Sequence, residues 1–152
     1  MDEIDEKILA ELQHDGRMSL TDLAARVGLS LSPCHRRVRE LERAGVISGY
    51  RAVVDPAAVD LGFEVLVFVT MAKGDQRTVA RFEEDVAGIP SVVLAQRLFG
   101  EPDYLLRVRC RDAADYQRIR DMRLAALPGV GRLNSTLVMK DIIRDRALER
   151  SA

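Results

Sequence analysis

The chain has few of the residues and runs that mark several large classes of protein. Its two cysteines, Cys34 and Cys110, lie far apart without a Cys-x-x-Cys pattern, and it has only two histidines. These counts argue against a metal site and a disulfide framework, and they fit a reducing compartment. The longest apolar run, residues 65–69, is too short to span a bilayer, and no secretory signal precedes it. We therefore expect a soluble cytoplasmic protein without a metal or other cofactor.

Signatures of common catalytic sites are also missing. The sequence has no P-loop, no Gly-x-Gly-x-x-Gly motif, no Ser-His-Asp order and no paired-carboxylate motif, so we expect a protein that is not an enzyme. Cys34 could be a redox-active thiol, because it sits beside His35 near a predicted helix start. Its place on an apolar stripe with Val38 and Leu41 favours a buried core thiol instead.

Charge is nearly balanced over the chain but unevenly distributed along it. The 23 basic and 24 acidic side chains give a formal net charge of -1. Residues 1–32 carry a net charge of -4, whereas residues 33–51, with five arginines and two glutamates, carry +3. From Ala52 onward 15 basic and 15 acidic side chains balance. A functional hypothesis must explain this basic segment.

The first third of the chain predicts three helices in quick succession. Apolar residues recur at helical spacing in each of them. Ser19 and Ser30 are candidate N-caps of the second and third helices, and Gly28 and Gly45 are candidate stops. Two short helices joined by a few residues with a glycine are typical of a helix-turn-helix. The β-branched segment 46–54 then predicts a strand or small wing.

From Glu64 onward the sequence contains an internal duplication, in which each half is a strand, a helix and a second strand. The step Ile-Pro-Ser-Val at 89–92 recurs as Leu-Pro-Gly-Val at 127–130, 38 residues later. Two tandem βαβ units predict a ferredoxin-like βαββαβ fold, with a four-stranded antiparallel sheet and both helices on one face. The apolar side chains of the other face must also be buried, and a second copy of the chain is the simplest partner that could bury them.

A set of short motifs follows in order along nearly the whole chain. They are Gly16-Arg17, Leu23-Ala24, Val27-Gly28-Leu29-Ser30, Arg37-Val38-Arg39-Glu40-Leu41-Glu42, Gly45-Val46-Ile47, Gly49-Tyr50, Gly100-Glu101-Pro102-Asp103-Tyr104 and Leu127-Pro128-Gly129-Val130. Together they resemble the Lrp/AsnC (feast/famine) family of transcriptional regulators. The stretch Ser32-Pro33-Cys34 is more similar to the leucine-responsive branch than to the asparagine-responsive one.

The resemblance implies a fold, partners and an assembly. It implies an α+β protein with a winged helix-turn-helix DNA-binding domain over 1–55, a linker over 56–63, and a ferredoxin-like domain for effector binding and oligomerisation over 64–152. It further implies a homodimer formed through the open sheet face, which assembles to a tetramer or octamer, and control by a small molecule, usually an amino acid. Two reading helices in a dimer predict a pseudo-palindromic site in double-stranded DNA, with half-sites about 34 Å apart.

The third helix supplies the candidate DNA contacts, because its apolar side chains point to the core and leave a basic face for solvent. Arginine can fork to a guanine edge or clamp a phosphate, and serine near a helix start can bond a phosphate. An ordinary solvated face would look similar, but a charge reversal on the second helix of a helix-turn-helix favours DNA. The candidates are Ser30, Ser32, Pro33, His35, Arg36, Arg37 and Arg39, followed by Arg43 and Arg51.

One of these arginines has a second interpretation. Arg37 matches the most regular position of the family, and it could instead pack against Leu41 or pair with Glu40 or Glu42. If Arg36 and Arg37 both bind phosphates, replacing either with alanine should flatten the salt dependence of DNA binding by about one unit for each phosphate that is no longer neutralised.

The turn over residues 100–104, which follows the strand predicted to end at Phe99, is the candidate effector site. Glycine there permits close backbone approach, turn N–H groups can hold a carboxylate, and Asp103 can accept from an ammonium group. A plain hairpin turn is the alternative interpretation. By the resemblance, a polar trio in the last strand completes the pocket from a neighbouring subunit, although a solvent-exposed face would look the same. The candidates are Phe99, Gly100, Glu101, Asp103, Tyr104, Asn134, Ser135 and Thr136.

Two other functions fit the same architecture. Sirohaem decarboxylases resemble this family in fold and are enzymes, so fold alone does not decide the function. However, both histidines, His14 and His35, lie outside the C-terminal half, which supplies little for tetrapyrrole carboxylate chemistry. The other alternative is a ligand-binding module without DNA affinity.

Overall fold

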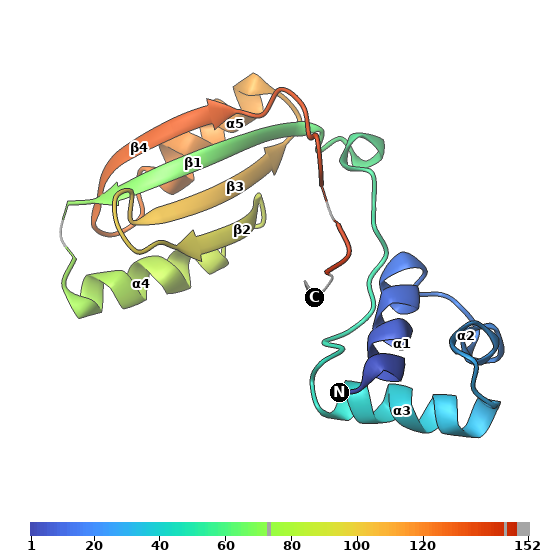
Figure 1. The fold of residues 1–152 in the computed structure, drawn as a ribbon. Coiled ribbons are helices and arrows are strands. Elements are labelled where there is room, and N and C mark those ends of the chain that lie inside the picture. Colours follow the sequence, from blue (N-terminus) through green and yellow to red (C-terminus); the bar gives the residue numbers. More distant parts are fainter. Residues whose placement is uncertain (73, 145, 149–152) are drawn as a thin grey trace. The chain divides into compact units, whose positions relative to one another are not determined.

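A computed structural model describes residues 1–72, 74–144 and 146–148 (Figure 1). The chain divides into two compact units, each with its own core. The first unit comprises residues 1–53 and the described residues after Asp141, and the second comprises residues 54–141. In the first unit, the side-chain amide of Gln13 accepts from the backbone N–H of Leu148 at 2.7 Å and donates to its carbonyl at 3.2 Å.

Three helices form the first unit, as the sequence predicts: α1 (Glu3–His14), α2 (Leu20–Val27) and α3 (Leu31–Arg43). Ser19 caps α2 by accepting from the backbone N–H of Asp22, and Gly28 ends it in a left-handed conformation. Apolar stripes from all three helices meet in one core, made of Ile8, Leu23, Ala24, Val27, Cys34, Val38 and Leu41. Packing of these stripes therefore sets which face of α3 remains exposed.

Two details of α3 sharpen the sequence interpretation. Ser30 occupies the N-cap position, but its side chain makes no capping hydrogen bond. Cys34 is fully buried in the core, so the prediction of a core thiol is confirmed. Burial raises the pKa of the Cys34 thiol above its ordinary value, which disfavours the reactive thiolate.

The predicted strand over residues 46–54 is not present. This segment is irregular, and the side chains of Val46, Tyr50, Val53 and Val54 are exposed. A strand needs a partner for its backbone N–H and C=O groups. The described residues of the first unit supply three helices and no strand, so β propensity alone does not produce one.

The second unit has the predicted βαββαβ order. Its elements are β1 (Phe63–Met71), α4 (Gln76–Ala87), β2 (Val92–Arg97), β3 (Tyr104–Cys110), α5 (Ala113–Ile119) with a π-helical turn (Arg120–Leu124), and β4 (Val130–Leu137). The strands are hydrogen-bonded in the order β2-β3-β1-β4, and every neighbouring pair is antiparallel. A short 3-10 helix (Pro56–Val59) precedes β1. The predicted ferredoxin-like sandwich is confirmed.

Alternation along the strands gives the sheet two different faces. Val65, Val67 and Val69 of β1 pack with Phe82 of α4 and Leu124 after α5 in one buried core. Both helices therefore lie on the same face of the sheet, as Figure 1 shows. The side chains between these valines point to the other face, which we call the open face. None of the helices among the described residues is both long and apolar enough to cross a membrane.

One end of the open face carries a buried ion-pair cluster. Glu64 is only 5% exposed although it lies outside the helix-covered core. Its carboxylate is 3.3 Å from Nε of Arg107 and forms a second, closer ion pair with Arg109. Both arginines come from β3, where they lie on the same face as Glu64. This cluster and the half-buried Leu66, Phe68 and Leu105 make the open face both charged and apolar.

The register shift where β4 pairs with the end of β1 leaves room only for a glycine at position 131. A Cβ atom there would lie 2.9 Å from the backbone nitrogen of Ala72, which itself donates to the carbonyl of Gly129 at 2.8 Å. We expect Gly131→Ala to lower the free energy of unfolding by about 1 to 3 kcal/mol in urea titrations. Gly74→Ala is the control, because a Cβ at Gly74 meets nothing within 4 Å. Equal stability of the two variants would contradict this expectation.

Candidate DNA-reading helix and ligand pocket

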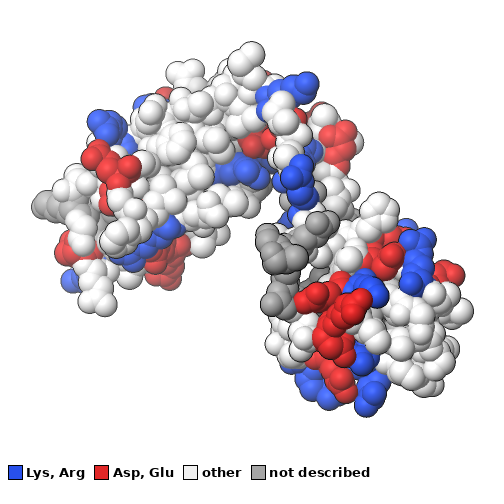
Figure 2. All heavy atoms as spheres, viewed as in Figure 1, with Lys and Arg blue, Asp and Glu red and all other residues white. Residues whose placement is uncertain are grey.

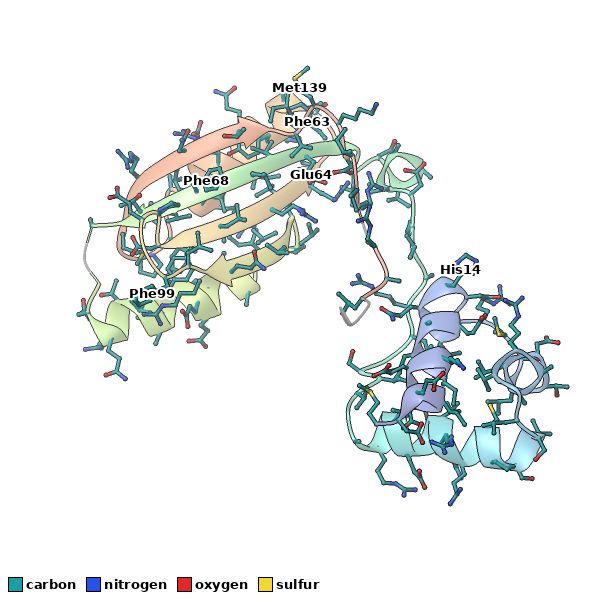
Figure 3. All side chains as sticks on the ribbon, viewed as in Figure 1. His14, Phe63, Glu64, Phe68, Phe99 and Met139 are labelled. Atoms are coloured by element: carbon teal, nitrogen blue, oxygen red, sulfur yellow. The ribbon has the colours of Figure 1, made fainter. Side chains whose placement is uncertain are left out.

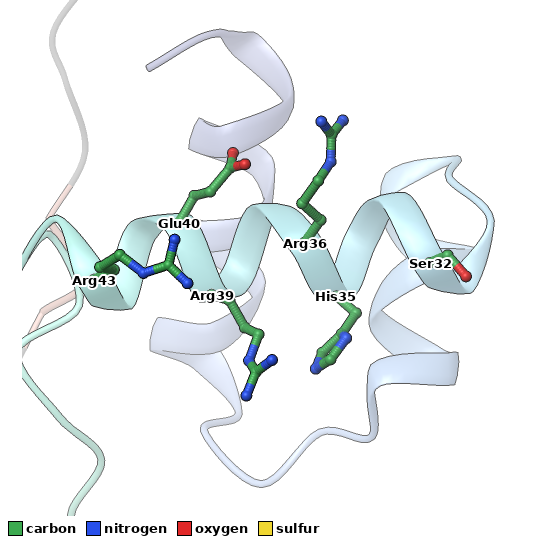
Figure 4. Close-up of a pocket in the computed structure, with 6 residues that line it drawn as sticks. All are labelled: Ser32, His35, Arg36, Arg39, Glu40 and Arg43. Carbon is green, nitrogen blue, oxygen red and sulfur yellow. The ribbon is translucent and has the colours of Figure 1, made fainter.

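The exposed face of α3 brings together most of the predicted DNA-binding residues. Ser32, His35, Arg36 and Arg39 are exposed, at spacings that place them on one side of the helix. With Glu40 and Arg43 they line a shallow hollow of about 290 Å³ (Figure 4). In Figure 2, basic side chains gather along the edge of this unit where α3 lies in Figure 1. The face can offer guanidinium forks, a hydroxyl and an imidazole to one ligand.

The remaining predicted DNA-binding residues lie around this face. Ser30 is exposed immediately before the first turn of α3, and Pro33 is half-buried within that turn. Arg51 is exposed on the irregular segment after α3. Glu40 stands among the arginines that line the hollow, so the face is less basic than its arginines alone would make it.

Arg37 does not belong to this face. Its guanidinium lies 2.8 Å from a carboxylate oxygen of Asp2 and 2.8 Å from one of Asp5, both in the first turn region of α1. Its side chain is 24% exposed. Arg37 therefore has ion-pair partners within the domain, as its second interpretation expects, although these partners are aspartates rather than Glu40 or Glu42. Its contact with DNA stays a prediction.

Asp2 and Asp5 also cap α1. Asp2 accepts from the backbone N–H groups of Ile4 and Asp5, and Asp5 accepts from the backbone N–H of Asp2. This reciprocal arrangement is a capping box, and Arg37 joins it to α3. The spacing of two acidic residues three apart before an apolar stripe could have revealed the box in the sequence. The backbone N–H of Asp5, assisted by Arg37, lowers the pKa of the Asp2 carboxyl below its ordinary value.

The lowered pKa of Asp2 predicts an acid-sensitive link between α1 and α3. The ionised carboxylate stabilises the fold above the unfolded pKa of about 4, and this stabilisation is lost as pH falls through the lowered folded pKa. We expect Asp2→Asn to be less stable than wild type at neutral pH and to show a shallower loss of stability below pH 4. Urea unfolding followed by circular dichroism across this range tests it. Identical pH profiles for both proteins would contradict the assignment.

The connection between β2 and β3 holds the predicted effector turn. Gly100 has φ 130°, a conformation that favours glycine. Phe99 beside it is fully exposed (Figure 3). Asp103 fixes the turn to β1, because its carboxylate accepts from the backbone N–H of Met71 at 2.7 Å and its own N–H donates to the carbonyl of Val69 at 2.9 Å. The turn is thus anchored on the end of β1.

Two predicted effector residues point to the helix-covered side of the sheet, away from the open face. Tyr104 is buried in the helix-covered core, where its ring packs against Phe82 and its hydroxyl donates to Glu83 at 2.8 Å. Desolvation raises the pKa of Tyr104 to about 12. The hydroxyl of Ser135 shares a hydrogen bond of 2.5 Å with that of Tyr116 from α5. Strand alternation explains both positions, since neighbouring residues point to opposite faces.

Two other predicted residues, Glu101 and Asn134, meet at one hollow on the open face, and Thr136 lies on the same face. Asn134 pairs with Phe68 across β4 and β1, and Thr136 pairs with Leu66 on the same face. Asn134 lines a hollow of about 320 Å³ together with Phe68, Thr70, Glu101, Pro102 and Arg132. Across its mouth Arg132 donates to Glu101 at 3.1 Å. We call this hollow the open-face pocket.

Sequence reasoning missed Phe68, Thr70, Pro102 and Arg132 in this pocket. The signal was available, because Arg132 is two residues before Asn134 and therefore shares its face of a strand. Phe68 and Thr70 follow the same rule in β1. Only the pairing of β1 with β4 places the two sets side by side.

Comparison with known proteins agrees with this architecture. Residues 1–48 match the winged helix-turn-helix DNA-binding family, and residues 64–148 match the Lrp/AsnC ligand binding domain. The Bkd operon transcriptional regulator of Pseudomonas aeruginosa is 41% identical over 143 residues, which is 94% of this chain and 94% of that protein. The leucine-responsive regulatory protein of Haemophilus influenzae is 37% identical over 142 residues, 93% of this chain and 86% of that protein.

Solved structures give the same result. A transcriptional regulator from Neisseria meningitidis, solved as a complex with L-Met, has a TM-score of 0.93 at 34% identity and covers 98% of this chain and 96% of its own. An AsnC family transcriptional regulator from Agrobacterium tumefaciens has a TM-score of 0.92 at 36% identity, with coverage of 98% and 97%. With a winged helix-turn-helix match followed by a Lrp/AsnC ligand binding domain, this chain belongs to the Lrp/AsnC family of transcriptional regulators.

Proposed function

We propose that this regulator reads DNA with α3 and responds to an amino acid that binds its second unit. Residues 1–55 act as the DNA-binding domain, residues 56–63 as the linker, and residues 64–152 as the domain for effector binding and assembly, although the described residues after Asp141 belong to the first compact unit. The observation that carries the proposal is the exposed basic face of α3 on the second helix of a helix-turn-helix. The protein acts as a regulator in the cytoplasm rather than as an enzyme, in keeping with the names of its relatives.

The DNA contacts come from the face of α3 and the turn before it. Arg36 and Arg39 bind phosphates or guanine edges, and Ser32 and His35 bind as neutral polar groups. Ser30, whose side chain makes no capping bond, is available for a phosphate at the helix start. Two copies present two such helices, which favours a pseudo-palindromic site.

Salt dependence of binding tests the assignment of α3. Removing one cation that neutralises a phosphate should reduce the slope of log affinity against log salt by about 0.9. We therefore expect Arg36→Ala to flatten the slope on double-stranded DNA, measured by fluorescence anisotropy between about 50 and 200 mM salt. Arg77→Ala removes an equal charge from the exposed surface of α4 and should leave the slope unchanged. A slope unaffected by Arg36→Ala would remove this residue from the interface.

The effector domain combines the open-face pocket with the turn that borders it. A free amino acid fits the size of this pocket and its mixture of a ring, an amide and an ion pair. The related regulator from Neisseria meningitidis was solved with L-Met, which supports an effector of this class. Phe99 and Gly100 form the exposed rim, and Asp103 positions the rim on β1.

Assembly follows from the open face of the sheet. Its half-buried apolar side chains and its ion-pair cluster form a surface that a second copy can cover, which makes a homodimer the basic unit. Dimers then join into a tetramer or octamer. Asn134 and Thr136 lie on the same face, and we expect them to meet a neighbouring subunit.

Calorimetry with the twenty standard L-amino acids tests effector binding. We expect wild type to bind at least one of them, and Asp103→Ala to bind it at least about tenfold more weakly, because the turn loses its bond to the Met71 N–H. Asp85→Ala, at an exposed position of α4, is the control and should bind as wild type does. Equal affinity of wild type and Asp103→Ala would contradict the proposed role of Asp103 in effector binding. Absence of binding by any amino acid would overturn the proposed effector class.

A further inference from the structure

One acidic side chain stands among the basic groups on the exposed face of α3. Six residues line the hollow there, and Glu40 is the acid among them. Its side chain is exposed, and it lies about one helical turn after Arg36 and three residues before Arg43. Figure 4 shows Glu40 and Arg36 projecting to one side of the helix, and His35 and Arg39 to the other. A carboxylate at this position opposes attraction to phosphates, so its presence calls for another explanation.

The carboxylate of Glu40 is not used in the fold of the free protein. Side chains of opposite charge that lie three or four residues apart on a helix can form ion pairs. Neither Arg36 nor Arg43 forms one with Glu40, which has no ion pair with any residue that the structure describes. Glu42, two residues later, instead accepts from the hydroxyl of Tyr50 at 3.1 Å. Glu40 therefore keeps its acceptor oxygens for a partner outside the chain.

We propose that Glu40 reads a cytosine in each DNA half-site, by accepting a hydrogen bond from the N4 amino group of that base in the major groove. The inference rests on the proposed function, because it assigns a base to one residue of the same reading helix. A carboxylate and a phosphate repel each other, since both are negatively charged. When α3 lies on DNA, Glu40 is therefore directed to the edges of the bases rather than to the backbone.

Cytosine is the base whose edge suits a carboxylate. In the major groove guanine presents only acceptors, and thymine presents an acceptor and a methyl group, so neither base can donate to Glu40. Adenine donates from N6, but its N7 acceptor lies beside that group and repels the second oxygen of a carboxylate. Cytosine presents the N4 donor without an acceptor of its own. The negative charge of Glu40 also makes it a stronger acceptor than a neutral group would be.

The exposed face of α3 has two rows of different chemistry. Residues four apart lie above one another on a helix, which divides the lining residues into two rows. One row is Ser32, Arg36 and Glu40, and the other is His35, Arg39 and Arg43. The row that contains Glu40 offers the mixture of donors and acceptors that base edges require, and the other row has no acid and suits phosphates. Glu40 thus sets the rotation of α3 on DNA, with its own row toward the bases.

The same carboxylate weakens binding to every other sequence. Non-specific binding comes from the attraction between basic side chains and phosphates, and a negative charge on the reading face opposes this attraction. At a base without a donor, Glu40 also gives up its bonds to water and gains no hydrogen bond in return. Specificity is the difference between two affinities, so Glu40 increases it at both ends.

Selection from a random library of double-stranded DNA by the full-length protein tests the assignment. Wild type should enrich a pseudo-palindromic site with a preferred cytosine at one position of each half-site. We expect Glu40→Ala to lose the preference at that position alone. Glu40→Gln should shift it toward adenine, because a glutamine amide can accept from N6 and donate to N7. Glu84→Gln, the same change at an exposed position of α4, is the control and should enrich the wild-type site.

Affinities for single sequences give a second measure, taken by fluorescence anisotropy at one salt concentration. Replacing the preferred cytosine pair with a thymine pair should weaken wild type by about 5- to 150-fold, and Glu40→Ala by less than about twofold. Both Glu40 variants should bind DNA of unrelated sequence more tightly than wild type does, because a negative charge has been removed. The Glu40 side chain is exposed, so both variants should fold as wild type does, which circular dichroism checks.

Other roles of Glu40 give a different pattern. If Glu40 only repels phosphates, or only orients a neighbouring arginine, both variants change the affinity for all sequences by the same factor and enrich the same site as wild type. That result overturns the inference, and DNA reading by α3 stands. If wild type enriches no sequence, the proposed function and the inference are both overturned.

Discussion

A sheet has two faces, and this chain supplies helices for only one of them. Alternation in β1 sends Val65, Val67 and Val69 into the core under α4 and α5, and it sends Phe68 and Thr70 to the opposite side. The open-face pocket and the surface proposed for a second copy both depend on this division. The pocket, the Glu64 cluster and the half-buried apolar side chains all lie on the open face.

In the first unit, the corresponding constraint is how α3 is held. Its apolar stripe fixes the rotation of the helix, and Arg37 ties it to the capping box of α1 through Asp2 and Asp5. Two aspartates of the acidic N-terminal segment therefore form ion pairs with one arginine of the basic segment. One arginine is used inside the domain, which leaves the arginines of the exposed face, among them Arg36 and Arg39, for a partner of opposite charge.

Local patterns predicted most of the fold, and partnerships between distant segments account for the errors. Helix stripes, the Ser19 cap and the repeated Pro step carry their signal within a few residues, so they could be interpreted directly. Arg37 could not be placed, because its partners lie more than 30 residues earlier in the chain. The strand predicted over 46–54 failed for a related reason, since a strand exists only where another strand accepts its hydrogen bonds.

Two of the predicted effector residues, Glu101 and Asn134, line the open-face pocket. The resemblance indicated the turn at Gly100 and the side chain of Asn134, but taking Asn134, Ser135 and Thr136 as one group ignored the alternation of a strand. Applying that rule separates Ser135, which bonds Tyr116 on the helix side, from its two neighbours. It also brings in Arg132. The period of the strand thus contained the information, and only the pairing with β1 required the structure.

Under the proposed function, the position of the pocket links ligand binding to assembly. If a second copy covers the open face, then the effector and the partner subunit use adjoining parts of one surface. Any difference in effector affinity between the free and the covered face must be matched by an equal difference in the strength of assembly, because the coupling between two binding events is reciprocal. A small molecule can therefore change how many reading helices are joined in one particle without touching α3. Since joined helices bind neighbouring half-sites at a raised effective concentration, such a change is sufficient to alter DNA occupancy.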